Sequence, residues 1–476
     1  MRTNSRREFL SSCILTGTFA IAGSPAAFAG PTPNDSEIRK ILDERIAALT
    51  SGKGGVGIIA GLLDANGARY VAAGQRDRND ARALSGSDPC EIGSMGKGFA
   101  GLVLADMVVH GEVALGDPVG KYLPHSAKIP ERNGRAITLF DLATHMSGLP
   151  FMPPIPSSPS PNYSASDLYA FLASYALTRD PGSDWEYSNL GYWLLSEALS
   201  ARSGTPYPAL LERRVLVPLG MTRSGIRLAS DMEPKPVIGH DASLNPAMPL
   251  SAAPVYNLMP AAGAGFYATA DDLVRFLSAA LRFRHVSIAK AIALSVAAHR
   301  PIPGSENLQA LGWTLYGGEH APLVFRDGGT FGFSSCIAWD ERSRKGAVVL
   351  ANCVGDIGDI GRHLLRPEYP IVAPSVAPIH TEIALTAEAL KKLVGRYEVE
   401  GEGVFAVSFD SDHLNFDAPS DWGLPRLRIR PESSTNFFVS EVPLRVTFQV
   451  LADGSVATMT IYPPRRQKGL VARRIG

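Results

Sequence analysis

The sequence is poor in features that would indicate a disulfide scaffold, a membrane protein or a nucleic-acid-binding protein. Four cysteines among 476 residues are too few to cross-link a chain of this size. No stretch reaches the roughly 18 uninterrupted apolar residues that span a bilayer, so we do not expect a membrane-spanning protein. Lys plus Arg equals Asp plus Glu, at 46 each, and this balance provides no net field toward nucleic acid or an anionic membrane.

Motifs that hold a metal or a dinucleotide are absent or misplaced. The sequence has no CxxC or HExxH pattern and its ten histidines are scattered, so no metal site is expected. Gly52, Gly54 and Gly57 match GxGxxG, but they precede a predicted strand, whereas a dinucleotide fingerprint follows one. We therefore expect no cofactor, and partners must be sought at a local site. The sequence carries no indication of oligomeric state.

The first 29 residues are typical of an export signal. Arg6 and Arg7 precede a short apolar run, and small residues flank Phe28. Consecutive arginines in that setting indicate twin-arginine export with cleavage after Ala29; a disordered basic tail is the alternative. We expect a periplasmic or secreted protein.

The mature chain keeps three cysteines, Cys90, Cys336 and Cys353. Cys336 and Cys353 flank two apolar strands joined by a charged turn, which leaves open a disulfide across a hairpin, although two buried thiols are favoured. Cys90 is interpreted as buried apolar filling.

The pattern of the chain predicts four segments: a signal peptide at 1–29, a large mixed domain at 35–365, a linker at 366–383 and an all-β domain at 384–476. Helical and strand periodicities alternate in the second segment and predict a mixed α and β core. Proline density marks the third segment as a linker. Short alternating strands, with a hairpin signal at Asp453 and Gly454, fill the fourth. A second Pro-rich stretch, at 150–163, predicts a surface loop inside the large domain.

Ser94 and Lys97 are three residues apart at the start of an apolar run, which places them on one face of a first helical turn. A lysine whose pKa falls toward neutrality takes the proton from a serine hydroxyl and makes it a nucleophile, and the positive end of the helix dipole favours the anion that forms. SxxK alone is a weak motif, because Ser287 and Lys290 form a second match with nothing catalytic around it.

Two downstream motifs strengthen the first match. Tyr187 and Asn189 stand with one residue between them immediately before a predicted helix, and Arg326, Asp327 and Gly328 precede a glycine-rich turn followed by an apolar strand. A phenol, an amide and a cation beside a glycine turn can all face one cleft. The joint order of the three motifs is more specific than any one of them.

This order resembles the penicillin-recognising serine hydrolases, in particular the group of class C β-lactamases, DD-peptidases and β-lactamase-like esterases. The resemblance covers about residues 40–365 and implies an α+β fold, in which an antiparallel sheet is flanked by helices and an all-helical lobe. It further implies a small barrel-like all-β domain behind the hydrolase domain.

The same resemblance implies a role for each motif. Ser94 would be the acylated nucleophile, with Lys97 and Tyr187 as its proton relay. Asn189 would hold the substrate amide, and Gly328 and Gly329 would line the substrate site, with the N–H groups of Ser94 and Gly329 as the oxyanion hole.

The third motif departs from the family pattern. Relatives start it with lysine or histidine, whereas this chain has Arg326. Arginine keeps a cation that can bind a carboxylate in a bidentate manner, but it does not deprotonate. We expect Arg326 to contact the substrate, with a surface arginine or one paired to Asp327 as the alternative. His145 is interpreted as a hydrogen-bonded structural residue.

These observations predict an exported serine hydrolase that opens an amide, either a β-lactam ring or a peptide at a D-amino acid, through an acyl-enzyme. Its partner would be a small molecule or a peptidoglycan peptide. A carboxylesterase on the same scaffold and a penicillin-binding protein that acylates without turnover are the alternatives. No GxSxG elbow occurs, so an α/β-hydrolase is not expected.

Overall fold

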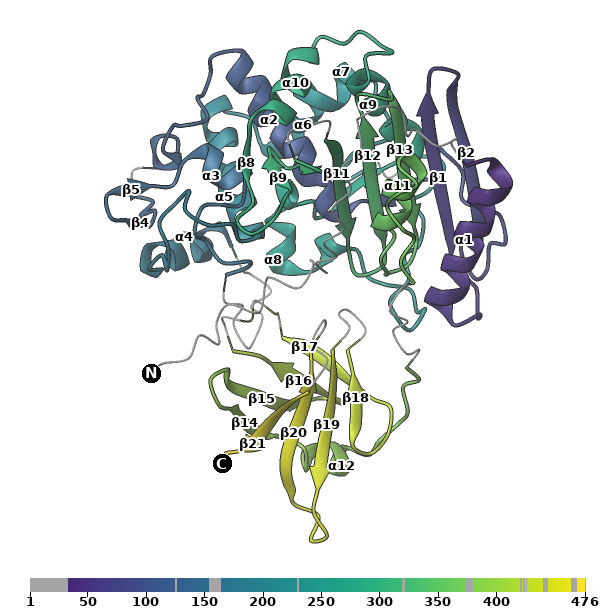
Figure 1. Cartoon of the computed structure of the whole chain (residues 1–476). Coiled ribbons are helices and arrows are strands. Elements are labelled where there is room, and N and C mark those ends of the chain that lie inside the picture. Colours follow the sequence, from purple (N-terminus) through teal and green to yellow (C-terminus); the bar gives the residue numbers. More distant parts are fainter. Residues whose placement is uncertain are drawn as a thin grey trace, which may run out of the picture.

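The structure is a computed structural model, and its two parts are separate in Figure 1: a large α+β part above and a small β-barrel below. It describes residues 33–124, 126–153, 164–228, 231–318, 322–373, 380–419, 422, 424, 426–439, 444–463 and 469–475. The predicted signal peptide lies outside these residues, as do most of the Pro-rich stretch at 150–163 and part of the predicted linker.

An eight-stranded antiparallel sheet is the centre of the large part (Figure 1). Its strands, in spatial order, are β2 (Gly67–Gly74), β1 (Gly57–Asp64), β13 (Lys345–Ala351), β12 (Ser334–Asp340), β11 (Leu323–Gly329), β10 (Thr314–Tyr316), β9 (Leu308–Ala310) and β8 (His299–Pro301). The sheet therefore joins the first strands after α1 to strands that lie almost three hundred residues later. This order brings β11, with the third motif, to the middle of the sheet.

Helices cover both faces of this sheet. The helices of the large part, including those of the lobe beside the sheet, are α1 (Asp35–Thr50), α2 (Gly96–Val109), α3 (Leu139–Ala143), α4 (Ala165–Ser174), α5 (Asn189–Ser203), α6 (Tyr207–Leu211), α7 (Val217–Leu219), α8 (Pro254–Asn257), α9 (Ala270–Ala280), α10 (Ala289–Ala297) and α11 (Gly358–Leu365). The helices α1 and α11 share one apolar core with the sheet, and α2, α5, α9 and α10 share a larger core with it. The predicted α+β class, with an antiparallel sheet and a helical lobe, is confirmed.

The periodic patterns of the sequence form the elements they predict. The first helix, α1, begins with a capping box in which Asn34 accepts from the Glu37 backbone N–H and the Glu37 carboxylate accepts from the Asn34 backbone N–H. The next two strands pair from Gly57 opposite Gly74 to Asp64 opposite Gly67. The two residues of the hairpin turn are Ala65 and Asn66, and Gly67, with a φ of +113°, begins β2.

The large part also contains two small sheets and several short helical turns, two of which bear on the site. A 3₁₀ turn, η1 (Gly93–Met95), leads into α2, and a second one, η5 (Pro260–Ala262), packs beside it. The small sheets are β3 (Cys90–Glu91), β7 (Phe266–Ala268) and β6 (Gly225–Ile226), and β4 (Glu131–Arg132) with β5 (Arg135–Ala136). The three cysteines Cys90, Cys336 and Cys353 are buried free thiols, so the favoured interpretation of the last two is correct.

The C-terminal part is a closed eight-stranded barrel in which each strand pairs with the next and the last pairs with the first. A short helix, α12 (Ala387–Lys391), precedes it. The strands are β14 (Gly395–Val399), β15 (Gly403–Asp410), β16 (His413–Asp417), β17 (Leu427–Pro431), β18 (Asn436–Phe438), β19 (Arg445–Val450), β20 (Val456–Tyr462) and β21 (Leu470–Arg474). Closure comes from Tyr397 opposite Arg474 and Glu398 opposite Arg473. The predicted barrel-like domain is confirmed.

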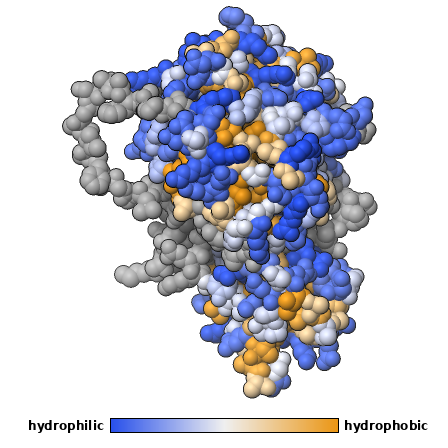
Figure 2. All heavy atoms as spheres, turned by 90° about the vertical axis from the view of Figure 1, so that its right-hand side faces the viewer, coloured by the Kyte–Doolittle hydropathy of each residue, from blue (hydrophilic) through white to orange (hydrophobic). Residues whose placement is uncertain are grey.

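The surface of the molecule is mostly polar on the face shown in Figure 2. Hydrophobic side chains gather at the far tip of the barrel, where Val450 and Leu451 stand at the turn after β19 and are 42% and 46% exposed. In the part of the chain that is described, we find no helix with the length and apolar character needed to span a bilayer.

Backbone contact between glycines sets the distance from β11 to the 3₁₀ turn η1. A Cβ on Gly328 would lie 2.0 Å from the Ile92 carbonyl oxygen, and one on Gly93 would lie 2.5 Å from the Gly329 carbonyl oxygen. Gly263 is as restricted, because its Cβ would lie 1.8 Å from the Gly93 carbonyl oxygen. Non-bonded atoms do not approach each other this closely. The contact between β11, η1 and Gly263, called the glycine seam below, therefore requires glycine at these three positions.

We expect Gly328→Ala to force β11 away from η1 and to lower the melting temperature by several degrees. This corresponds to overpacking by about 1 to 3 kcal/mol. Gly225→Ala is the matched control, because Gly225 also lies in a strand, has an ordinary φ, and a Cβ there would meet nothing within 4 Å. Thermal unfolding measures both variants. Equal melting temperatures would contradict the steric account of the glycine seam.

A buried ion pair joins the first and last helices of the large part. Arg45 Nη2 donates to Asp359 Oδ2 at 2.6 Å, and the two side chains are 2% and 4% exposed. The same carboxylate oxygen accepts from the backbone N–H of Val372 at 2.7 Å. The pair therefore links α1, α11 and the segment that follows α11.

We expect Asp359→Ala to destabilise the large part by about 3 to 5 kcal/mol, because it leaves a buried guanidinium without its counter-ion. The control is Glu44→Ala, which breaks the exposed pair of Lys40 and Glu44 and should cost less than about 0.5 kcal/mol. Urea unfolding followed by tryptophan fluorescence measures both. A loss for Asp359→Ala no larger than that for Glu44→Ala would show that the buried pair adds nothing.

Candidate active site

Ser94 lies in η1, between β3 and α2, with the left-handed φ of Gly93 (+51°) turning the chain before it. The first N–H groups of a helix have no acceptor within the helix. The N–H of Ser94 is one of these groups. The turn thus presents a hydroxyl and an N–H at the positive end of a helix.

Lys97 is completely buried in the first turn of α2, directly behind Ser94. Its Nζ donates to Ser94 Oγ at 3.1 Å and to the Ala262 carbonyl oxygen at 2.9 Å. Burial, with the nearby Arg326 guanidinium as the second cause, holds the pKa of Lys97 well below its usual value. Among the ion pairs of the described residues, none includes Lys97. The arrangement favours a neutral amine in contact with the serine.

Tyr187 reaches the same hydroxyl from the residue pair that precedes α5. Its phenol donates to Ser94 Oγ at 2.7 Å, and Lys97 Nζ lies 4.8 Å from the centre of the ring. Burial raises the pKa of Tyr187, and the Arg326 guanidinium opposes this rise. The sequence motifs predicted that Ser94, Lys97 and Tyr187 belong to one site. In the structure the three residues are in mutual contact.

Arg326 lies under this cluster on β11 and is 4% exposed. Its Nε donates to the Ser94 carbonyl oxygen at 3.0 Å and its Nη2 to the Tyr187 hydroxyl at 2.9 Å. The neighbouring Asp327 is exposed and points to the other face of the strand; no ion pair between the two appears among the described residues. The sequence predicted that Arg326 contacts the substrate; in the structure, two of its donors are bonded to Ser94 and Tyr187.

Gly329 turns its N–H toward η1. Thr330 N–H donates to the Phe333 carbonyl oxygen at 2.9 Å, and Gly328 and Gly329 lie opposite Ser335 and Ser334 on β12. Because antiparallel pairs alternate between bonded and non-bonded, the N–H of Gly329 points away from β12. It therefore faces the side of the strand on which Ser94 lies.

A cavity of about 270 Å³ opens beside Ser94. Its walls come from Ser94, Tyr187, Asn189 and Gly329, and from Phe151, Leu250, Tyr256, Ala262, Ala264, Thr330 and Phe331. Asn189 is 6% exposed, and its Oδ1 is buried without a hydrogen-bond partner. A buried acceptor without a partner is costly, and the residue that carries it lines the cavity.

His145 packs beside the cluster. Its Nδ1 accepts from the Ser188 backbone N–H at 3.2 Å, and its ring centre lies 4.5 Å from that of Tyr187. Burial lowers the pKa of His145 well below its usual value, and Arg326 and Lys97 add to this effect. A neutral, hydrogen-bonded histidine agrees with its interpretation as a structural residue.

Several residues of the site had no clear signal in the sequence. Glu91 is 1% exposed and accepts from the backbone N–H groups of Leu250 and Gly265 at 3.1 to 3.2 Å. Burial raises its pKa, although these bonds oppose the rise. The only sequence feature that pointed to a role for Glu91 is its position three residues before Ser94. The cavity walls at Tyr256 and Phe331 had none.

The second SxxK match is not a site. Ser287 and Lys290 are both exposed, as expected of a chance match.

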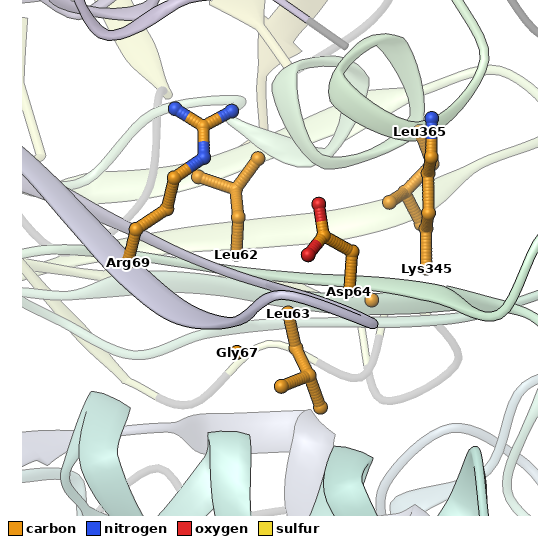
Figure 3. Close-up of a pocket in the computed structure, with 8 residues that line it drawn as sticks. Leu62, Leu63, Asp64, Gly67, Arg69, Lys345 and Leu365 are labelled. Carbon is orange, nitrogen blue, oxygen red and sulfur yellow. The ribbon is translucent and has the colours of Figure 1, made fainter. Parts of the chain in front are cut away.

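A hollow of about 10 Å³ beside the β1–β2 turn has room for one water molecule. In Figure 3, Leu62 and Asp64 point to one side of strand β1 and Leu63 points to the other. Within the described part of the chain, no group of three His, Cys, Asp or Glu side chains is arranged to hold a metal.

Comparisons with known proteins agree with this geometry. The family model for β-lactamases matches residues 42–365, and residues 380–471 match a domain of unknown function, DUF3471. The D-alanyl-D-alanine-carboxypeptidase/endopeptidase AmpH of Escherichia coli K12 is 27% identical over 369 residues, which are 72% of this chain and 91% of AmpH. Protein flp of Staphylococcus aureus strain COL is 27% identical over 285 residues, 59% of this chain and 56% of flp.

A crystal structure from Yersinia pestis, of a β-lactamase/D-alanine carboxypeptidase complexed with citrate, has the same fold. The TM-score is 0.55 at 24% identity, and the match covers 67% of this chain and 92% of that one. A family model that spans most of the chain, on a fold that brings serine, lysine and tyrosine together, decides the assignment. The chain belongs to the β-lactamase family and is a serine hydrolase of the β-lactamase/DD-peptidase type.

Proposed function

We propose that Ser94 is the nucleophile of an acyl-enzyme reaction on an amide bond, with Lys97 and Tyr187 as its proton relay. The observation that carries this proposal is the hydroxyl of Ser94, which touches both the buried Lys97 Nζ and the phenol of Tyr187 at the cavity wall. A serine becomes a good nucleophile when a neighbouring base takes its proton. The lowered pKa of Lys97 suits that role.

Acylation then proceeds in two proton transfers. The proton of Ser94 Oγ passes to the neutral amine of Lys97 as Oγ bonds to the substrate carbonyl carbon. The C–N bond breaks next, and the leaving nitrogen takes a proton from the relay through Tyr187, whose hydroxyl touches Ser94 Oγ. Water afterwards hydrolyses the ester on Ser94, which restores the hydroxyl and releases the acid.

The oxyanion of each tetrahedral intermediate would be held by the N–H groups of Ser94 and Gly329. Two backbone donors aimed at one point lower the barrier because they stabilise charge that develops in the transition state. Asn189, which lines the cavity and has an Oδ1 without a hydrogen-bond partner, would bind an N–H of the substrate. Gly328 and Gly329 would form the adjoining wall.

We propose a β-lactam ring or a peptide at a D-amino acid as the substrate, and a periplasmic or secreted location reached by the twin-arginine route. The printed name of AmpH, a D-alanyl-D-alanine-carboxypeptidase/endopeptidase, supports the substrate class. The consecutive Arg6 and Arg7 support the route. Peptidoglycan peptides occur in that compartment.

A carboxylesterase on the same scaffold is the second candidate. The residues that line the cavity carry no charge, and an ester needs none for its recognition. A protein that forms the acyl-enzyme without turnover is the third reading, because acylation and hydrolysis of the acyl-enzyme make separate demands on the site.

Three substrates distinguish these candidates: a chromogenic cephalosporin, a D-alanyl-D-alanine peptide and a short-chain nitrophenyl ester. We expect turnover of at least one, and a loss of about a thousandfold or more in kcat for Ser94→Ala. Ser287→Ala is the matched control, because it removes the serine of the exposed SxxK match and should keep full activity.

The outcomes separate the readings. Full activity of Ser94→Ala would refute the proposed mechanism. Turnover of the ester alone would favour the carboxylesterase. Stoichiometric labelling of Ser94 by the cephalosporin, without release of product, would favour the binding protein.

The pH profile should report the amine of Lys97. A base acts only when it is deprotonated, so kcat/KM should fall as the pH drops through the lowered pKa of Lys97. Arg326→Met removes the adjacent cation, so the pKa of Lys97 should rise and the acidic limb should move up by about one unit. Arg282→Met, which removes an exposed arginine, should leave the limb in place. An unchanged limb in Arg326→Met would contradict Lys97 as the base.

A further inference from the structure

We propose that the cavity beside Ser94 selects neutral substrates with an aromatic or bulky apolar acyl group and no carboxylate next to the scissile bond. This inference rests on the proposed acyl-enzyme function and narrows its substrate class. Its basis is the charge and the shape of the cavity lining, together with the position of the cation that would otherwise hold a carboxylate.

The lining of the cavity is uncharged. Its polar members beyond Ser94 and Tyr187 are Asn189, Thr330 and the backbone at Gly329, and none of the residues that line it is Lys, Arg, His, Asp or Glu. A carboxylate that leaves water for such a site loses its hydration without gaining a counter-ion, which costs several kcal/mol. An amide, an ester or an internal peptide bond does not carry this cost.

Arg326 is the cation of the third motif, and its hydrogen bonds go to groups of the protein itself. Its Nε is bonded to the Ser94 carbonyl oxygen and its Nη2 to the Tyr187 hydroxyl. The side chain is 4% exposed and is not part of the cavity lining. A guanidinium used as a fork between two internal acceptors positions Ser94 and Tyr187, and it does not present that fork to a substrate.

Aromatic rings form the walls. The rings of Tyr256 and Phe331 meet edge to face with centres 5.9 Å apart, and Phe151 stacks on Tyr187 at 6.0 Å. Leu250 adds aliphatic surface. Rings in these arrangements accept a further aromatic or branched apolar group by the same offset and edge contacts. The unpartnered Oδ1 of Asn189 meets an N–H on the acyl side.

A matched pair of peptides tests the charge. N-acetyl-D-phenylalanyl-D-alanine and its C-terminal amide share the scissile bond and differ in one carboxylate. We expect the neutral amide to have the higher kcat/KM, by about tenfold or more. Replacement of D-phenylalanine by D-alanine in the neutral member should lower kcat/KM by about tenfold, and Tyr256→Ala should reduce this difference.

Arg326→Lys tests the role of the cation. Lysine keeps the charge but cannot make both bonds of the fork, so kcat/KM should fall by the same factor for the acid and the amide. Equal rates for the two peptides in the wild type, a preference for the acid, or an Arg326→Lys loss confined to the acid would each overturn the inference and leave the acyl-enzyme mechanism intact. If no peptide and no nitrophenyl ester is turned over in a Ser94-dependent manner, the proposed function fails, and the inference fails with it.

Discussion

The burial of a lysine side chain without a carboxylate is the constraint on which the site depends. Lys97 has no exposed surface, and its amine touches one carbonyl oxygen and one hydroxyl. An ammonium in such surroundings is poorly stabilised, and a guanidinium close by makes it less stable still. The protein thus keeps a strong base in its neutral form, at the cost of stability that the surrounding core must supply.

The rest of the large part holds this base against the serine. The turn η1 supplies Ser94, the first turn of α2 supplies Lys97, and η5 supplies the Ala262 carbonyl. Strand β11 approaches so closely that only glycine fits at 93, 263 and 328. Glu91 joins the loops before α8 and β7 to the strand that leads into Ser94. The geometry of the site is therefore set by backbone distances more than by the side chains that perform the chemistry.

Sequence patterns predicted the parts of the fold that have strong periodicity. The first helix, the β1–β2 hairpin, the long helices and the barrel strands all carry repeats of 3.6 or 2 residues. The strands β8, β9 and β10 have three residues each, too few for a period, and were not foreseen. The motif residues Ser94, Tyr187 and Asn189 line one cavity with Lys97 directly behind Ser94, and all four stand at or just before the start of a helix.

The direction of Arg326 could not be predicted in the same way. The sequence shows a cation in the third motif, but which acceptors its fork meets depends on how β11 packs against η1. Tyr256 and Phe331 are similar cases, because they lie in a four-residue helix and in a turn, and only the folded chain brings them to one wall. Residues of this kind are found from tertiary contacts and not from spacing.

The closed barrel behind the hydrolase domain has no free strand edge. Every strand from β14 to β21 has two neighbours, whereas the catalytic sheet ends in β2 on one side and β8 on the other. An open edge is a template on which another chain can add a strand. The barrel can take no such strand, so any association that it makes must use side chains, such as Val450 and Leu451 at its exposed tip, and its own hydrogen bonds stay intact when a second domain or protein comes near.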